Sequence, residues 1–190
     1  MTPVTIPSGA MIDTTGLVEP IDGERASVFL RPGDWLFGRG SYRVGTLLGT
    51  CVSVVMWSRR LHTGGICHAL LPRRTRAGQV PGPGHYVEES LDWMAASFAR
   101  QGCGLKGLDI SVIGGAKCWR SRIGADNVEA AMQWLDARGL QAQRVDTGGS
   151  RVRKLTFDMR QGDLMVAMAG VMATGENQHE HETHQGHGGR

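Results

Sequence analysis

Glycine occupies 28 of the 190 positions, roughly twice its usual share of about 7%. Because glycine destabilises helix interiors, this content disfavours a long helical bundle or a coiled coil. It fits short strands joined by tight turns. A length of 190 residues favours one domain that buries a core of its own.

Charge and cysteine usage exclude several classes of protein. The 21 Lys and Arg against 18 Asp and Glu give a net charge of +3, which is too small to predict a nucleic-acid-binding surface. The N-terminus lacks a basic start followed by an apolar core, and the longest uncharged run, residues 44–58, is shorter than the roughly 20 residues of a membrane span. The four cysteines form no CxxC pair. We therefore expect free thiols and a cytoplasmic protein.

Apolar periodicity predicts an alternation of strands and helices. Strands are predicted over 27–30, 35–37, 51–57, 66–71, 108–113, 153–158 and 163–168. Helices are predicted from residue 87 to about 98 and from 126 to 138, the second with an Asp126–Glu129 capping box and an apolar stripe of Val128, Met132 and Leu135. Two hairpins are expected, one across a polar turn over 59–65 and one around Gly162.

This order predicts an α+β fold with mixed or antiparallel sheets and two main helices on one side. Residues 1–25 show no sustained period and are expected to be a flexible lead-in. The domain itself is expected over residues 26–175. Residues 176–190 carry His among Gly, Glu and Gln and are expected to be a disordered tail.

The segment Leu48-Gly-Thr-Cys-Val52 places a thiol at the mouth of a buried strand. A tight turn through Gly49 and Thr50 points backbone N–H groups into one small volume. Such groups would lower the pKa of the Cys51 thiol and later hold an oxyanion. The alternative is that Cys51 packs as a small hydrophobic residue.

A histidine on the next predicted strand is the natural partner of this cysteine. Strand alternation puts Ile66, His68 and Leu70 on one face, so Cys67 points away and packs in the core. A Cys–His pair across neighbouring strands is the minimum for thiol nucleophilic catalysis, because the imidazole takes the thiol proton. The alternative is a core histidine with satisfied hydrogen bonds.

Other sites have weaker support. Zinc binding would draw on side chains without CxxC or HxxxH spacing, namely Cys51, Cys67, His62, His68 and His85. No P-loop, GxGxxG or GxSxG motif occurs, so we expect no metal and no cofactor. The basic cluster at residues 73–76 is either a solvated loop or a contact for an acidic helix.

Five blocks in order resemble the CheD family of chemoreceptor glutamine deamidases. The resemblance as a whole spans about residues 27–168. Its blocks read T-L-L-G-T-C-V at 46–52, G-G-I-C-H-A-L-L-P at 64–72, G-G-A-K at 114–117, I-G-A-D-N at 123–127, and D-T-G-G followed by Arg153 and Phe157. The resemblance implies a three-layered α/β/β fold related to cytotoxic necrotizing factor deamidase toxins. It implies hydrolysis of receptor glutamine side chains to glutamate.

The resemblance also assigns roles to residues. Cys51 would be the nucleophile, His68 the general base and acid, and Gly49 and Thr50 part of the oxyanion turn. The third catalytic residue of the family, a Thr six positions before the Cys in some members, corresponds to Gly45 here. Thr46 is the nearest hydroxyl and our candidate, with a backbone carbonyl as the alternative partner of His68.

The implied partners are the cytoplasmic coiled-coil helices of chemoreceptors, with a CheC-type phosphatase as a further candidate. Contact with the membrane would occur only through those receptors, and we expect a monomer. The alternative function is a non-catalytic chemotaxis adaptor that binds receptors or the phosphatase.

Overall fold

The computed structural model describes residues 11–13, 26–74 and 83–172. The predicted His-rich tail and most of the predicted N-terminal lead-in lie outside these ranges. Within the described ranges no helix is both long and apolar enough to cross a membrane.

Ten strands form two sheets. The six-stranded sheet has the order β1-β3-β6-β5-β7-β8, and the four-stranded sheet has the order β10-β9-β4-β2. The strands are β1 Met11–Asp13, β2 Ala26–Phe29, β3 Trp35–Gly38, β4 Tyr42–Leu48, β5 Val52–Ser58, β6 Thr63–Cys67, β7 Asp109–Gly114, β8 Arg144–Thr147, β9 Arg151–Asp158 and β10 Leu164–Val171. The helices are α1 Val87–Arg100 and α2 Ile123–Asp136, with a short 3₁₀ turn over Pro83–His85.

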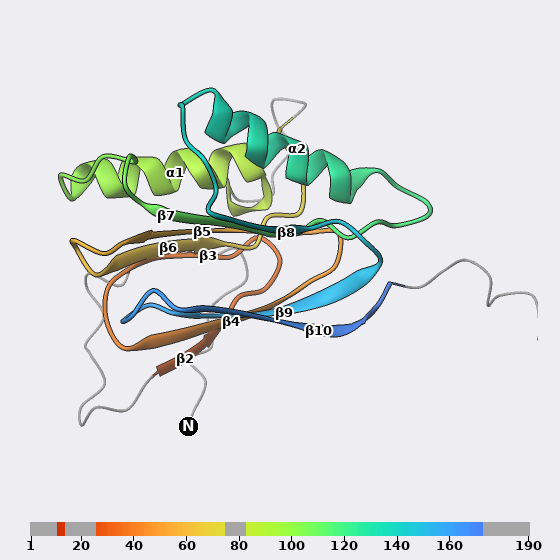
Figure 1. Ribbon diagram of the computed structural model, residues 1–190, viewed down its shortest axis with the longest axis horizontal. Helices are drawn as coiled ribbons and strands as arrows, with labels where there is room; N and C mark the ends of the chain where they lie inside the picture. The colour runs from red at the N-terminus through yellow and green to blue at the C-terminus, as the bar shows by residue number, and fades with distance from the viewer. Residues whose placement is uncertain (1–10, 14–25, 75–82, 173–190) are drawn as a thin grey trace, which may run out of the picture.

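The six-stranded sheet is covered on both faces. Both α-helices lie on one face, and the four-stranded sheet lies against the other (Figure 1). Alternate residues of β5 serve two cores: Val54 and Met56 pack with α1 and α2, while Val55 and Trp57 pack against the four-stranded sheet. All seven residues of β5 are therefore buried, as expected for a strand covered on both faces.

The predicted α+β class is confirmed, with two helices and two mixed sheets. Both predicted hairpins are present, because β5 pairs antiparallel with β6 and β9 pairs antiparallel with β10. Helix α1 buries the predicted apolar positions Val87, Leu91, Met94 and Phe98.

The turn between β5 and β6 is shorter than predicted. Strand β6 begins at Thr63, so Gly64 and Gly65 belong to the strand and not to a polar turn. A Cβ on Gly64 would lie 2.9 Å from the Phe157 ring, and one on Gly65 would lie 2.8 Å from Met94 Sδ. These glycines make room for the side chains of both cores. The strand ends at Cys67, before the predicted end at residue 71.

Helix α2 begins three residues before the predicted start, and the predicted capping box is wrong. Its N-cap is Arg122, which makes no side-chain capping hydrogen bond. Of the predicted stripe, Leu135 is buried, while Val128 and Met132 are only partly buried. The other buried side chains of the helix are Asn127, Ala130, Ala131 and Trp134.

Three strands were not predicted: β1, β4 and β8. Strand β1 falls in the predicted lead-in and pairs parallel with β3. Strand β4 alternates buried and outward residues along Tyr42–Leu48, but Gly45 and Thr46 interrupt its apolar pattern. Its inward face carries Thr46, which matters for the site.

Candidate active site

Cys51 and His68 lie at the ends of the neighbouring strands β5 and β6. Val52 and Ala69 exchange two backbone hydrogen bonds, of 3.0 and 2.9 Å, in an antiparallel bridge. This register puts Ser53 opposite His68 and makes Cys51 its diagonal neighbour. Diagonal neighbours on one face are about 7–8 Å apart, within reach of long side chains. The two predicted residues therefore share the face toward the four-stranded sheet, while Cys67 lies on the helix side.

The backbone of His68 is held from both sides by the segment before β3. Gly33 donates its N–H to the His68 carbonyl at 2.8 Å, and His68 donates its own N–H to the Asp34 carbonyl at 2.9 Å. The Asp34 side chain is fully buried and accepts the Arg31 N–H at 2.8 Å. The imidazole thus projects from a fixed length of backbone.

The Thr46 hydroxyl fixes the tautomer of His68. Thr46 Oγ1 donates to the Leu30 carbonyl at 2.9 Å and lies 2.7 Å from His68 Nδ1. A hydroxyl has one proton, and a carbonyl can only accept. Nδ1 must therefore donate to Thr46, which leaves the lone pair on Nε2. Both partners weighed for His68 take part, because the hydroxyl contacts the ring and the carbonyl orients the hydroxyl.

His68 is a neutral base at physiological pH. Burial lowers the pKa of His68 to about 4. A hydrogen bond with the Leu30 backbone and the charge of Asp34 raise this pKa by smaller amounts. A histidine with that pKa is unprotonated at pH 7, as a general base must be.

The expected lowering of the Cys51 pKa is wrong. Cys51 is partly buried, and burial raises the pKa of its thiol more than its own backbone N–H lowers it. The resting pair is therefore a thiol beside a neutral imidazole. Little thiolate is therefore present at Cys51 near pH 7.

Two peptide carbonyls of the turn before Cys51 accept hydrogen bonds from neighbouring segments. Ala116 N donates to the Gly49 carbonyl at 2.8 Å, and Asn127 Nδ2 donates to the Thr50 carbonyl at 3.1 Å. In a planar trans peptide the N–H points opposite to the carbonyl. The N–H groups of Thr50 and Cys51 consequently point away from Ala116 and Asn127.

The end of β7 closes on this turn. Gly115 donates its N–H to the Cys51 carbonyl at 2.8 Å. Gly114 has φ 112° and lies so close to the Cys51 carbonyl oxygen that a side chain there would overlap it. The Gly114–Gly115 pair therefore lets the six-stranded sheet hold the turn by its backbone.

Asn127 is a site residue that was not predicted as one. Its Nδ2 donates both to the Thr50 carbonyl and, at 2.8 Å, to the Leu70 carbonyl, and the side chain is fully buried. It thereby ties the turn before β5 to the chain that follows His68. The available signal was its position as the last residue of the I-G-A-D-N block at 123–127, but the block alone does not say which groups its amide contacts.

The side chains considered for zinc are not brought together. No group of three or more His, Cys, Asp or Glu side chains that could hold a metal occurs among the described residues. Two residues of the basic cluster at 73–76 form ion pairs with α1. Arg73 pairs with Glu88, and Arg74 pairs with Glu89.

Comparison with known proteins shows a consistent set of relatives. The family model described as CheD chemotactic sensory transduction matches residues 70–168. This match begins two residues after His68, so Thr46, Cys51 and His68 lie outside the matched range.

Full-length relatives extend the similarity over most of the chain. A probable chemoreceptor glutamine deamidase CheD 1 of Chromobacterium violaceum is 30% identical over 172 residues, covering 87% of this chain and 89% of the relative. The corresponding protein of Maridesulfovibrio salexigens is 36% identical over 73% of this chain and 89% of its own length. That of Pyrococcus abyssi is 31% identical, over 70% of this chain and 86% of its own.

Proposed function

The chain belongs to the CheD family, and we propose that it is a protein-glutamine glutaminase that deamidates glutamine side chains of chemoreceptors. Cys51 is the nucleophile, His68 the general base and acid, and Thr46 the residue that orients the imidazole. The observation that carries this proposal is the hydrogen bond from His68 Nδ1 to Thr46, beside a cysteine that the strand register places on the same face.

The first half of the reaction forms a thioester. His68 Nε2 takes the Cys51 proton as the sulfur attacks the carbon of the glutamine side-chain amide. The N–H groups of Thr50 and Cys51, beside Gly49, hold the resulting oxyanion, where the loss of one donor typically costs about 10²–10³ in rate. Nδ1 stays bonded to Thr46, so the ring keeps its orientation when the imidazolium forms.

The first half ends when the imidazolium returns its proton to the amide nitrogen, the oxyanion collapses, the C–N bond breaks and ammonia leaves the thioester. The second half hydrolyses that thioester. Water then attacks the thioester while His68 Nε2 takes its proton. The C–S bond breaks, the proton passes to the sulfur, and glutamate is released with Cys51 restored.

The remaining parts of the proposal rest on the family resemblance and not on this chemistry. The substrates are cytoplasmic coiled-coil helices of chemoreceptors, which places the protein in the cytoplasm, acting as a monomer. A CheC-type phosphatase stays a predicted partner. We also propose that the helices and two sheets form the α/β/β sandwich shared with cytotoxic necrotizing factor deamidase toxins.

The adaptor alternative gains no specific support from the geometry. Its motive was the displacement of the family's Thr by one position. In the described structure the hydroxyl of Thr46 nevertheless contacts His68, so the displacement does not leave the imidazole without an orienting partner.

The test is mass spectrometry of a chemoreceptor cytoplasmic fragment after incubation with the protein. Wild type should convert specific glutamines to glutamate, and Cys51→Ala should convert none. Cys103→Ala is the matched control, because it removes a thiol on the helix side of the sheet and should keep the activity. Equal glutamine content after wild type and Cys51→Ala would refute the enzyme, and binding of the fragment without conversion would favour the adaptor.

A further inference from the structure

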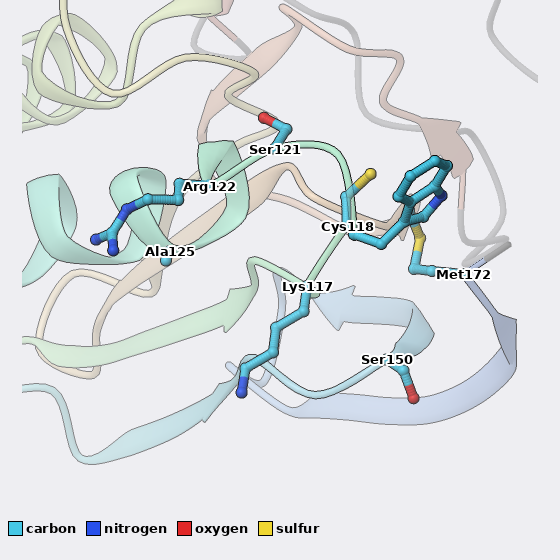
Figure 2. Close-up of a pocket in the computed structure, with 8 residues that line it drawn as sticks. Lys117, Cys118, Ser121, Arg122, Ala125, Ser150 and Met172 are labelled. Carbon is cyan, nitrogen blue, oxygen red and sulfur yellow. The ribbon is translucent and has the colours of Figure 1, made fainter. Parts of the chain in front are cut away.

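A cavity of about 450 Å³ lies beside the proposed active site. It is formed where the segment between β7 and α2, the turn between β8 and β9 and the residue after β10 meet (Figure 2). Its lining residues are Lys117, Cys118, Trp119, Ser121, Arg122, Ala125, Ser150 and Met172.

The cavity shares a wall with the turn that carries Cys51. A Cβ on Gly49 would lie 3.0 Å from Met172 Sδ, so the methionine side chain covers that glycine. Ala116, next to the lining residue Lys117, donates to the Gly49 carbonyl at 2.8 Å. Gly49 and Cys51 are two Cα–Cα steps apart, at most about 7–8 Å. The Met172 wall of the cavity therefore lies within roughly 15 Å of the sulfur, at most about three helix turns, since one turn rises about 5.4 Å.

One end of the cavity is apolar and carries a solvent-exposed aromatic side chain. The Trp119 side chain is 60% exposed, and the Arg120 guanidinium lies 4.1 Å above its ring. This stacking limits the rotamers of the indole. Cys118 and Met172 lie at the same end of the cavity (Figure 2). An exposed tryptophan beside an apolar cavity is typical of a binding hot spot.

The rim of the cavity is basic. Residues 115–126 contain three cations, Lys117, Arg120 and Arg122, and one acid. That acid, Asp126, lies 3.6 Å from Arg122 in an exposed ion pair, which contributes little. The two charges within it cancel, so the rim keeps a positive surplus that favours acidic partners.

Resting on the function proposed above, we propose that this cavity docks the stretch of receptor helix that flanks the target glutamine. The occupant is an amphipathic helical segment with an apolar side chain one to three turns from that glutamine. Acidic side chains beside it face Lys117 and Arg120. The cavity would then select which glutamines reach Cys51, because only those with this spacing place an amide at the sulfur.

The test measures binding without chemistry, in the Cys51→Ala background, using a chemoreceptor cytoplasmic fragment as the probe. Adding Trp119→Ala should raise the Kd roughly tenfold or more, as truncation of a hot-spot aromatic does. Adding Lys117→Gln should weaken binding and reduce its dependence on salt. The matched control is Met165→Ala, a side chain 61% exposed on β10, which should change the Kd by less than about twofold.

The outcomes separate this inference from the proposed function. If wild type converts glutamines but Trp119→Ala neither weakens binding nor raises KM, the docking site is wrong and the enzyme stands. If wild type converts nothing while Trp119→Ala still weakens binding, the enzyme is wrong and the docking site stands. If the variants spare fragment binding and abolish binding of a CheC-type phosphatase instead, the cavity belongs to that partner and the proposal fails.

Discussion

At the scale of single residues, the site depends on one hydroxyl with two partners. Thr46 connects a backbone carbonyl to His68 Nδ1, and this chain of hydrogen bonds selects the tautomer that can accept a proton at Nε2. Burial keeps the imidazole neutral. Burial of Cys51 likewise keeps its thiol protonated, so both side chains are uncharged at neutral pH.

Thr46→Val tests that hydroxyl. The change leaves His68 Nδ1 and the Leu30 carbonyl without a partner, so we expect kcat to fall roughly 10²-fold, in the range of a general-base contribution. Thr46→Ser should keep most of the activity. Ser53→Ala is the matched control, because Ser53 is also buried on this face, and its hydroxyl makes no hydrogen bond within the described structure. A full rate in Thr46→Val would contradict the role of the hydroxyl.

Acidification should reveal the depressed pKa of His68. The unfolded chain binds a proton near pH 6.5 and the folded protein only near pH 4, so stability is complete above 6.5 and is lost as pH falls toward 4. The shift corresponds to about 3 kcal/mol. Urea unfolding at pH 7 and pH 4.5 should show part of this loss in wild type and a smaller one in His68→Gln. The same loss in both proteins would assign the effect to other groups.

At the scale of elements, two cores and one side chain hold the catalytic turn in place. Strand β5 packs against helices on one side and the four-stranded sheet on the other. Asn127 of α2 then connects the turn before β5 with the chain after β6. The turn thus depends on an element that carries none of the proposed catalytic side chains.

Asn127→Ala should both destabilise the protein and slow the reaction. Two partly buried carbonyls lose their donor, at most about 1–3 kcal/mol each, and the turn that carries the N–H groups of Thr50 and Cys51 loses a support. We expect kcat to fall with little change in KM. Gln133→Ala is the control, because it removes an exposed amide from the same helix. An unchanged kcat would show that the turn holds its shape without Asn127.

Gly64→Ala should destabilise the fold through steric overlap. The added methyl would lie 2.9 Å from the Phe157 ring in the core between the sheets, and overpacking of this kind costs about 1–3 kcal/mol. Gly104→Ala, where the methyl meets nothing within 4 Å, is the control. Urea denaturation compares the two, and equal stability would contradict the assigned packing.

The sequence predicted an element correctly where its local hydrophobic pattern defines it. It failed where packing against residues remote in sequence decides the structure. The buried run of β5 and the amphipathic face of α1 were predictable, because hydrophobic periodicity alone defines them. Gly64 and Gly65 suggested a turn, because the side chains that occupy their space, Phe157 of β9 and Met94 of α1, are remote in sequence. Strand β4 was missed because its inward-facing residue Thr46 is polar. The reason for a hydroxyl there is its contact with His68, which lies elsewhere in the chain.

At the scale of the whole molecule, the candidate site lies where the two sheets and α2 meet. The six-stranded sheet supplies Cys51 and His68, the four-stranded sheet supplies Thr46, and α2 supplies Asn127. The sequence predicted the Cys–His pair, since both lie in one hairpin. It could not predict the thiol pKa, because the balance between burial and local N–H groups is set by the packed structure.

The most direct measurement of covalent catalysis uses hydroxylamine as a competitor for water. In its presence, wild type acting on a chemoreceptor cytoplasmic fragment should yield glutamyl hydroxamate at the same positions that otherwise become glutamate, because a thioester on Cys51 reacts with either nucleophile. Mass spectrometry should find neither product with Cys51→Ala. Glutamate formed at the wild-type rate by Cys51→Ala, or formed by wild type with no hydroxamate at any hydroxylamine concentration, would contradict the account.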